Sequence, residues 1–252
     1  MDLPVDPDQR RAQRAAQARS FGAAADVYER ARPSYPAEAL DWVLPPGARR
    51  VLDLGAGTGK LTRLLLARGL DVVAVEPTAG MREQFAAVLP GVTLLEGTGE
   101  DLPLPSSSVD AVVAGQSWHW VDPDRAAPEV ARVLRPGGWL GLLWNVRDPS
   151  VDWVAQLDRT LPGPGEEHLG SLAPRVGAPF GPVERYDVRW RQPTSVEGLL
   201  DLTRSRSWVI TLDEQRRREV LEDVRRQAEE RLRAAGELVV PYVTRCSRTR
   251  LP

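Results

Sequence analysis

The chain has 252 residues, of which 42% are hydrophobic and 27% are charged. These values lie close to the globular average and exclude a wholly disordered chain, a collagen-like repeat and a membrane protein, while the length fits one large domain. The formal net charge of −2 disfavours bulk nucleic-acid binding, and the single cysteine, Cys246, excludes an intramolecular disulfide and a cysteine-rich zinc site.

The N-terminal part, residues 1–48, is expected to supply cap helices to the domain. Residues 1–19 are polar and lack an apolar stripe, so we expect a frayed segment or an exposed helix there, with the first packed element near Phe21. The chain has no apolar run of about 20 residues, the length needed to span a bilayer, and its acidic start is unlike a signal peptide. We therefore expect a cytoplasmic protein with no membrane partner.

Residues 49–148 alternate short apolar runs with helical patterns and are expected to form a ligand-binding core. The apolar runs lie at 51–54, 72–75, 92–95, 109–114 and 139–144, and the helical patterns at 61–67, 81–89 and 125–134. This alternation is typical of a doubly wound α/β fold, in which helices cover both faces of a mostly parallel sheet. The strands are apolar throughout, as expected when both of their faces are buried.

Residues 149–252 follow a different pattern and are expected to complete the same domain. We expect loops at 162–165 and 174–182, a strand at 183–190, a helical block at 195–208, a charged helix at 213–235 and a strand at 238–244 that is broken by Pro241. The last two strands are predicted to form an antiparallel edge hairpin of a seven-stranded sheet. Their long connection, about residues 195–236, is predicted to form a helical lid. Acids and bases interleave in the charged helix, which favours a solvated face with side-chain pairs.

A glycine-rich turn joins the first strand of the core to its first helix. Its glycines, at alternate positions, are Gly55, Gly57 and Gly59. Such a turn lets the backbone bend sharply and approach a ligand closely, although an ordinary tight turn is the simpler interpretation. A dinucleotide motif counted from Gly55 would need glycine where Lys60 stands, and a phosphate-binding loop would need glycine at Leu54. Neither motif matches.

Two acids accompany this turn. Glu76 ends the second strand, 21 residues after Gly55, where a carboxylate can accept hydrogen bonds from both hydroxyls of a ribose. The alternative is that Glu76 is simply a solvated acid at the end of a strand. Asp53 precedes the turn and is expected either to contact the ligand or to hold the loop by accepting from its amides. Together these residues indicate a nucleoside ligand that has no pyrophosphate.

Four successive motifs resemble those of the class I S-adenosylmethionine-dependent methyltransferases. They are 51–59, 74–77 (Ala-Val-Glu-Pro), 96–103 (Glu-Gly-Thr-Gly-Glu-Asp-Leu-Pro) and 133–138 (Val-Leu-Arg-Pro-Gly-Gly). The resemblance implies methyl transfer from S-adenosylmethionine to an oxygen, or to a nitrogen or carbon, of a small molecule, leaving S-adenosylhomocysteine. A carboxylic acid or a hydroxylated metabolite is the expected acceptor. No metal is required by this chemistry, although carboxylates could still hold magnesium.

The same resemblance implies a set of cofactor-binding residues, which are Asp53, Gly55, Ala56, Gly57, Thr58, Gly59, Glu76, Pro77, Met81, Thr98, Gly99, Glu100 and Gln116. Relatives often carry aspartate where Thr98 stands, so the adenine contact here is expected from Glu100 or from backbone. Residues 21–36 and 116–122 resemble a narrower branch, of the type 11 methyltransferases, that includes trans-aconitate methyltransferase-like enzymes. That likeness implies that Tyr28, Arg32 and Tyr35 reach the methionine end of the cofactor.

His119 is the candidate general base. It follows the fourth strand at the edge of the sheet where ligands of doubly wound folds collect, and a neutral imidazole there could take a proton from a hydroxyl or an amine. The alternative is that it packs between Trp118 and Trp120. These two tryptophans are expected to bind substrate, or else to be core or pocket wall.

Arg204 and Arg206 are expected to grip a substrate carboxylate from the lid, because a guanidinium can donate two parallel hydrogen bonds to it. The partner is expected to be a small-molecule acceptor rather than nucleic acid, and the protein a monomer or homodimer. Two other functions stay open: a non-catalytic S-adenosylmethionine-binding or regulatory protein, and a nicotinamide-dependent oxidoreductase, which the failed dinucleotide motif disfavours.

Overall fold

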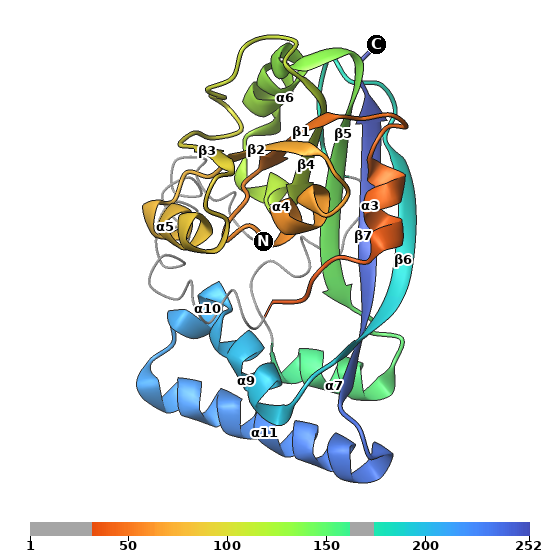
Figure 1. The fold of residues 1–252 in the computed structure, drawn as a ribbon. Coiled ribbons are helices and arrows are strands. Elements are labelled where there is room, and N and C mark those ends of the chain that lie inside the picture. The colour runs from red at the N-terminus through yellow and green to blue at the C-terminus, as the bar shows by residue number, and fades with distance from the viewer. Residues whose placement is uncertain (1–31, 162–173) are drawn as a thin grey trace, which may run out of the picture.

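A computed structural model describes residues 32–161 and 174–252. Within these ranges seven strands form one sheet in the order β3-β2-β1-β4-β5-β7-β6 (Figure 1). The strands are β1 (Arg50–Leu54), β2 (Asp71–Val75), β3 (Thr93–Leu95), β4 (Val109–Gly115), β5 (Leu134–Arg147), β6 (Glu184–Pro193) and β7 (Val239–Arg250). Strands β1 to β5 pair in parallel, whereas β7 runs antiparallel to both β5 and β6. The predicted mostly parallel sheet with an antiparallel edge hairpin is confirmed.

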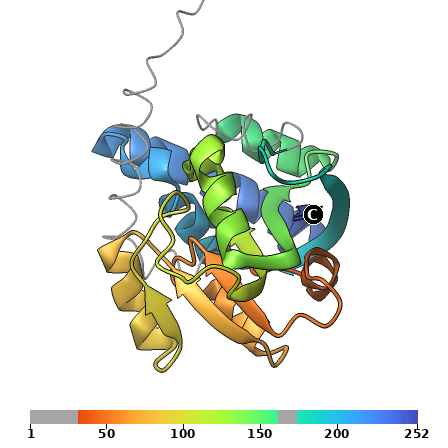
Figure 2. The same ribbon diagram turned by 90° about the horizontal axis from the view of Figure 1, so that it is seen from above.

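Helices cover both faces of the sheet (Figure 2). One face carries α3 (Ala37–Val43), α4 (Lys60–Leu66) and α5 (Ala79–Val88), and the other carries α6 (Pro123–Val133). Successive strand residues alternate between the two cores: Val51 packs with the first group of helices, and Leu52 packs with α6. Burial on both faces therefore explains why the strands are apolar throughout.

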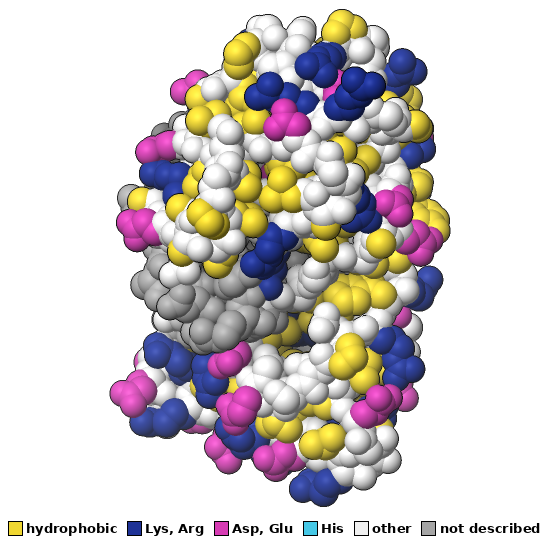
Figure 3. Space-filling view, viewed as in Figure 1, with side chains coloured by type: hydrophobic (Ala, Val, Ile, Leu, Met, Phe, Trp, Pro, Cys, Tyr) yellow, Lys and Arg dark blue, Asp and Glu magenta, His cyan; other side chains and the backbone are white. Residues whose placement is uncertain are grey.

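A separate helical layer lies beyond the carboxyl ends of the parallel strands (Figure 1). It consists of α7 (Asp152–Thr160), α9 (Val196–Arg204), α10 (Ser207–Ile210) and α11 (Glu214–Ala235), which we call the C-terminal helical layer. Its own core contains Leu157, Leu200 and Val224. Positive and negative side chains are interspersed over it (Figure 3), and α11 carries Arg–acid pairs such as Arg218–Glu214 at 2.8 Å, as predicted for a solvated face.

The structure corrects the expected elements in three places. The block predicted at 195–208 is two helices, α9 and α10, with Ser205 as the C-cap of the first. Helix α7 was not predicted, although its apolar residues Val154 and Leu157 recur at helical spacing. Strand β7 is not broken by Pro241, because β5 ends opposite Tyr242 and the missing proline N–H faces no β5 partner.

Some predictions fall outside the ranges that the structure describes. These are the N-terminal segment 1–19, the packed element near Phe21, Tyr28 and the loop at 162–165. Among the helices that are described, none combines the length and the apolar composition needed to cross a membrane.

Candidate functional site

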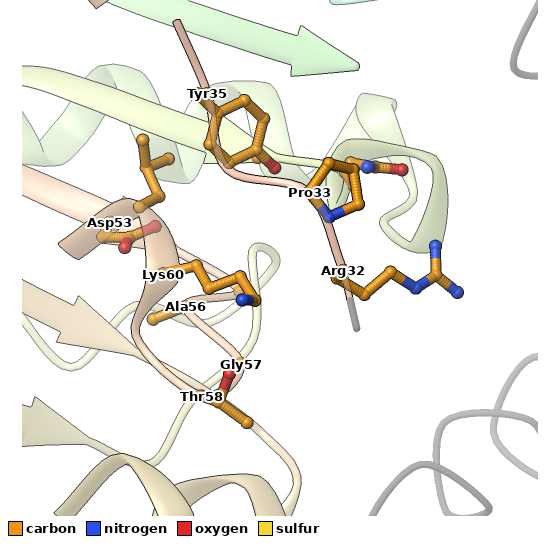
Figure 4. Close-up of a pocket in the computed structure, with 12 residues that line it drawn as sticks. Arg32, Pro33, Tyr35, Asp53, Ala56, Gly57, Thr58 and Lys60 are labelled. Carbon is orange, nitrogen blue, oxygen red and sulfur yellow. The ribbon is translucent and has the colours of Figure 1, made fainter. Parts of the chain in front are cut away.

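A pocket lies at the carboxyl ends of β1 and β4 (Figure 4). Its walls come from the turn between β1 and α4, from the end of β4 and from the segment 32–35 that precedes α3. The lining residues are Arg32, Pro33, Tyr35, Asp53, Gly55, Ala56, Gly57, Thr58, Lys60, Leu61, Gly115 and Gln116. The chain leaves β1 toward β2 on one side, while β4 lies on the other, so this is the switch point at which doubly wound sheets bind ligands.

The glycine turn has the backbone conformation that the sequence predicts. Gly55 and Gly57 have φ values of +71° and +56°, which side chains with a Cβ rarely adopt. A Cβ on Gly55 would lie 2.5 Å from Ser117 Cβ, so the end of β4 closes against the turn there. A Cβ on Gly57 would meet nothing within 4 Å. The turn is therefore packed at Gly55 and open to a ligand at Gly57.

Glu76 is buried at the end of β2 and is tied to this turn. Its Oε2 accepts a hydrogen bond from Gly57 N, and its Oε1 accepts one from Thr78 N, both at 2.9 Å. Each carboxylate oxygen has a second acceptor position. Glu76 thus shapes the glycine turn and retains the capacity to accept two hydroxyl groups.

Asp53 is 1% exposed and is the penultimate residue of β1, beneath the turn. Its Oδ2 accepts a 2.6 Å hydrogen bond from Thr62 Oγ1, so Asp53 is held by α4 rather than by the loop amides. Its Oδ1 is buried in the pocket wall and has no hydrogen-bond partner among the residues described. Burial, followed by repulsion from Glu76, raises the pKa of Asp53 to about 7. This orphaned oxygen fits a ligand that brings a cation or a hydrogen-bond donor.

The segment before α3 crosses the pocket from the opposite side (Figure 4). Asn145 Nδ2, on β5, donates to Ser34 O at 2.8 Å and fixes this segment to the sheet. Tyr35 lies over Gly115, where an added Cβ would come within 2.6 Å of the tyrosine oxygen. Arg32 Nη2 donates to Ser205 O at 3.4 Å, at the end of α9. Arg32 and Tyr35 therefore both line the pocket, but the guanidinium of Arg32 is turned toward the C-terminal helical layer.

The other predicted cofactor residues divide into two groups. Ala56, Thr58 and Gln116 line the pocket with the glycines, and Gln116 has a φ of +54°. Gly59 is the N-cap of α4 and packs against α5. It is not among the residues that line the pocket.

The second group follows β2 and β3. Met81 is buried in α5, and the carbonyl of Pro77 accepts from Arg82 at 2.7 Å. Thr98 and Gly99 lie in the loop after β3, beside Glu100, whose Oε1 accepts from Asp122 N at 2.7 Å. These residues follow the carboxyl ends of β2 and β3 and are not among the residues that line the pocket. Their role in binding the adenine stays a prediction.

His119 lies in a short 3₁₀ helix, η1 (Trp118–Trp120), that follows β4. Its ring packs on Trp120, with centroids 4.6 Å apart, three residues beyond the pocket residue Gln116. Trp118 is 4% exposed and belongs to the core beneath α6, with its indole N–H donating to Arg175 O at 2.9 Å. This placement favours the packing interpretation for Trp118 and leaves His119 and Trp120 at the sheet edge.

Arg204 and Arg206 lie at the end of α9 and after it. Arg204 Nη1 is 2.7 Å from Asp201 Oδ1, and it lines a second cavity, of about 310 Å³, together with Val209 and Arg217 of the helical layer. Arg206 is the N-cap of α10. Neither Arg204 nor Arg206 is thus among the residues that line the pocket at β1 and β4, and Arg204 is paired with Asp201 on its own helix.

Several pocket residues were missed by sequence reasoning. Lys60, Leu61 and Gly115 line the pocket, and Asn145 anchors the segment that covers it. Lys60 directly follows the glycine turn, so its position in the motif was a usable signal, whereas the contact of Asn145 with Ser34 joins residues 111 apart and leaves no local pattern. Among the residues described, no cluster of three or more His, Cys, Asp or Glu side chains is placed to hold a metal ion.

Comparisons with known proteins identify the relatives of this chain. A family model described as a methyltransferase domain matches residues 52–142. An uncharacterized methyltransferase of Mycobacterium tuberculosis is 50% identical over 234 residues, which cover 92% of this chain and 96% of that protein. An uncharacterized methyltransferase-like protein of Schizosaccharomyces pombe is 33% identical over 205 residues, covering 77% and 79%. The solved structure of a type II methyltransferase from Anaeromyxobacter dehalogenans covers 87% of this chain and 97% of its own, with a TM-score of 0.59 and 24% identity, and supports the fold.

Proposed function

Because the chain belongs to the class I S-adenosylmethionine-dependent methyltransferases, we propose that it binds S-adenosylmethionine in the pocket at β1 and β4 and methylates a small molecule. The acceptor is a carboxylic acid or a hydroxylated metabolite, and the attacked atom is an oxygen. The observation that carries this proposal is the pair of buried acids at the glycine turn. Glu76 has two acceptor positions left beside the open Gly57, and Asp53 has an oxygen in the pocket wall that no residue in the described ranges partners.

Different residues bind the two ends of the donor. Glu76 accepts from the ribose hydroxyls, and Asp53 faces the amino group of the methionine portion. When bound, the donor supplies a sulfonium methyl group, an activated electrophile that a nucleophile can attack directly. The protein therefore has mainly to align the acceptor with that methyl group and to exclude water. Tyr35 and the helical layer, which acts as the lid, enclose the site.

We assign His119 as the general base for a neutral acceptor. Replacing His119 with Ala should then lower turnover by roughly 10²–10⁴-fold, the usual worth of positioned proton transfer, while donor affinity stays nearly unchanged. At saturating donor, turnover of the native protein should also fall below about pH 6.5, the ordinary pKa of histidine. Steady-state assays of both proteins from pH 5.5 to 8.5 test this. If the variant keeps most of its activity and the profile is flat, the nucleophile is an already ionised group and His119 is only packed on Trp120.

Two experiments test the function itself. Titration calorimetry should give saturable binding of S-adenosylmethionine and S-adenosylhomocysteine and none of NAD. Binding of NAD without either adenosyl ligand would overturn the proposal. A screen of small acids and phenols with methyl-labelled donor then identifies the acceptor, and binding of the donor with no transfer to any acceptor would favour the non-catalytic alternative.

A further inference from the structure

The second cavity, of about 310 Å³, lies within the C-terminal helical layer. Among the residues described, those that line it come from the end of α9, from α10 and from the first two turns of α11 (Figure 1). They are Arg204, Val209, Ile210, Arg217 and Leu221. None of them also lines the pocket at β1 and β4. Sites for small molecules commonly have volumes of about 300–1,000 Å³, so this cavity is large enough to hold a small ligand.

The lining of this cavity combines apolar side chains with cations. Val209 is fully buried, and Ile210 and Leu221 are half-buried. These three side chains supply an apolar wall, while the two arginines supply positive charge. Small-molecule sites typically pair a mostly apolar wall with a few polar groups that fix the orientation of the ligand. The cavity therefore fits a molecule that has an apolar body and an anionic end.

The charge of Arg204 is already compensated within the helical layer. Its Nη1 lies 2.7 Å from Asp201 Oδ1 and 3.9 Å from Glu197 Oε2. Glu197 also pairs with Arg225 of α11, at 2.8 Å. These two acids and two arginines balance one another. Arg204 therefore has little charge left for a ligand, and the two acids add no net negative charge that would repel an anion.

Arg217 is the cation of the cavity whose charge is not compensated. Its Nη2 donates to Leu212 O at 2.8 Å, which holds the guanidinium at the start of α11. The next residue, Arg218, pairs with Glu214 at 2.8 Å, whereas no ion pair found within residues 32–161 and 174–252 includes Arg217. Its Nε is shielded from solvent and has no hydrogen-bond partner in those ranges. A partly buried cation without an anion is unfavourable, and a ligand carboxylate would relieve that cost.

We propose that this cavity binds a small amphipathic carboxylate. The anionic end pairs with Arg217, and the apolar chain packs on Val209, Ile210 and Leu221. The site is separate from the donor pocket, so the inference goes beyond the proposed function and does not depend on it. The grip on a carboxylate that the sequence predicts for Arg204 then belongs to Arg217, because Asp201 already pairs with Arg204.

The first experiment measures binding of octanoate, a carboxylate with a short apolar chain, by titration calorimetry. The native protein should bind it saturably. Arg217→Met keeps an apolar side chain but removes the charge, so it should weaken octanoate by roughly 10- to 150-fold, as expected for a charge-assisted hydrogen bond. The matched control, Arg218→Met, removes the exposed arginine beside it and should change the affinity by less than about twofold. Absence of binding to the native protein, or equal weakening in the two variants, would overturn the inference.

The second experiment locates the bound octanoate without changing an arginine. Leu221→Trp places an indole ring in the cavity and should weaken octanoate by about tenfold or more, with native circular dichroism as the check of folding. Lys60→Met removes the cation of the donor pocket and should leave octanoate affinity within about twofold of the native value. The reverse pattern, with binding kept in Leu221→Trp and lost in Lys60→Met, would place octanoate in the donor pocket and contradict the second site.

Discussion

At the scale of single residues, Asp53 is a pocket residue whose pKa lies near neutral pH, so its charge changes in the range where the protein would be assayed. Its carboxyl group is buried, Thr62 satisfies one oxygen, and its pKa is raised to about 7 because burial disfavours the charged form. The free protein therefore holds Asp53 largely protonated below pH 7. In the proposed binding mode the cationic amino group of the donor pairs with the ionised form, so protons and donor would compete for this site.

The affinity for S-adenosylhomocysteine should consequently depend on pH. Below pH 7 it should fall by up to about tenfold per pH unit, because Asp53 must lose its proton before it pairs with the ligand ammonium, and above pH 7 it should level off. Replacing Asp53 with Asn should lower the affinity at pH 8 and remove the dependence between pH 6 and 8. Calorimetric titrations across this range measure both effects. A native affinity that is constant from pH 6 to 8 would contradict the assignment of Asp53.

Glu76 should contribute to donor affinity through two routes, its ribose contact and its hold on the turn. Glu76→Ala should weaken S-adenosylhomocysteine by about 1.5–3 kcal/mol, or roughly 10- to 150-fold. The exposed strand-end acid Glu96, paired with Arg82 at 2.7 Å outside the pocket, is the matched control, and Glu96→Ala should change the affinity by less than about twofold. Equal affinity of a folded Glu76→Ala variant and the native protein would remove Glu76 from the site.

At the scale of elements, the segment 32–36 is positioned by contacts that are distant in sequence. Tyr35 lies on Gly115 at the end of β4, and the peptide of Ser34 is held by Asn145 on β5. Asn145 Oδ1 accepts from Thr244 Oγ1 at 2.6 Å, and that hydroxyl accepts from Trp190 Nε1 at 2.8 Å. A chain of hydrogen bonds therefore runs from the edge strand to the wall of the pocket.

Gly115→Ala should displace Tyr35 without disturbing the glycine turn. The added methyl group would lie 2.6 Å from the tyrosine oxygen, and the φ of Gly115 is not left-handed, so the cost is steric rather than conformational. We expect the free energy of unfolding to fall by about 1–3 kcal/mol, the usual cost of overpacking, and donor affinity to fall because Tyr35 is moved from the pocket wall. Gly181→Ala is the control, because its nearest neighbour is 3.7 Å away. Isothermal titration calorimetry measures the donor affinity of both variants. Equal affinities of Gly115→Ala and Gly181→Ala would mean that Tyr35 does not help to close the pocket.

The elements that sequence reasoning predicted are those with a local signal. The parallel strands were visible as apolar runs, and the glycine turn and Glu76 were visible from their spacing. What it missed depends on tertiary contacts: α7 buries Leu157 in the core of the helical layer, and β7 continues past Pro241 because β6 pairs with it on both sides of the proline. No local sequence pattern indicates the direction of the Arg32 side chain, because that direction depends on a hydrogen bond to Ser205, 173 residues away.

At the scale of the whole molecule, the helical layer has a core of its own. Leu157, Leu200 and Val224 are fully buried in it, on three different helices. The layer joins the sheet through apolar residues of β7, such as Val240, and through the buried Arg147 on β5, which pairs with Asp158 on α7. The stability of the fold therefore depends on the apolar cores on the two faces of the sheet, on that of the helical layer and on this ion pair.

Leu200→Ala should destabilise the protein by about 2–5 kcal/mol, because it leaves a cavity in the core of the helical layer. Leu232→Ala, on α11, removes a side chain that is 39% exposed and should cost less than about 1 kcal/mol. Urea denaturation followed by circular dichroism measures both free energies of unfolding. Similar losses in the two variants would show that the helices do not share a packed core.

The ends of the connection that carries α9, α10 and α11 are neighbours. Pro193 at the end of β6 pairs with Val239 at the start of β7, and Thr194 N donates to Leu238 O at 2.9 Å. A loop whose ends are already joined costs little more to close when it is lengthened, since the entropy of closure rises only with the logarithm of loop length. The connection can therefore be lengthened or shortened at little entropic cost while the sheet and the glycine turn stay the same. Under the proposed function, specificity for the acceptor can therefore change in this segment while the glycine turn that binds the donor is kept.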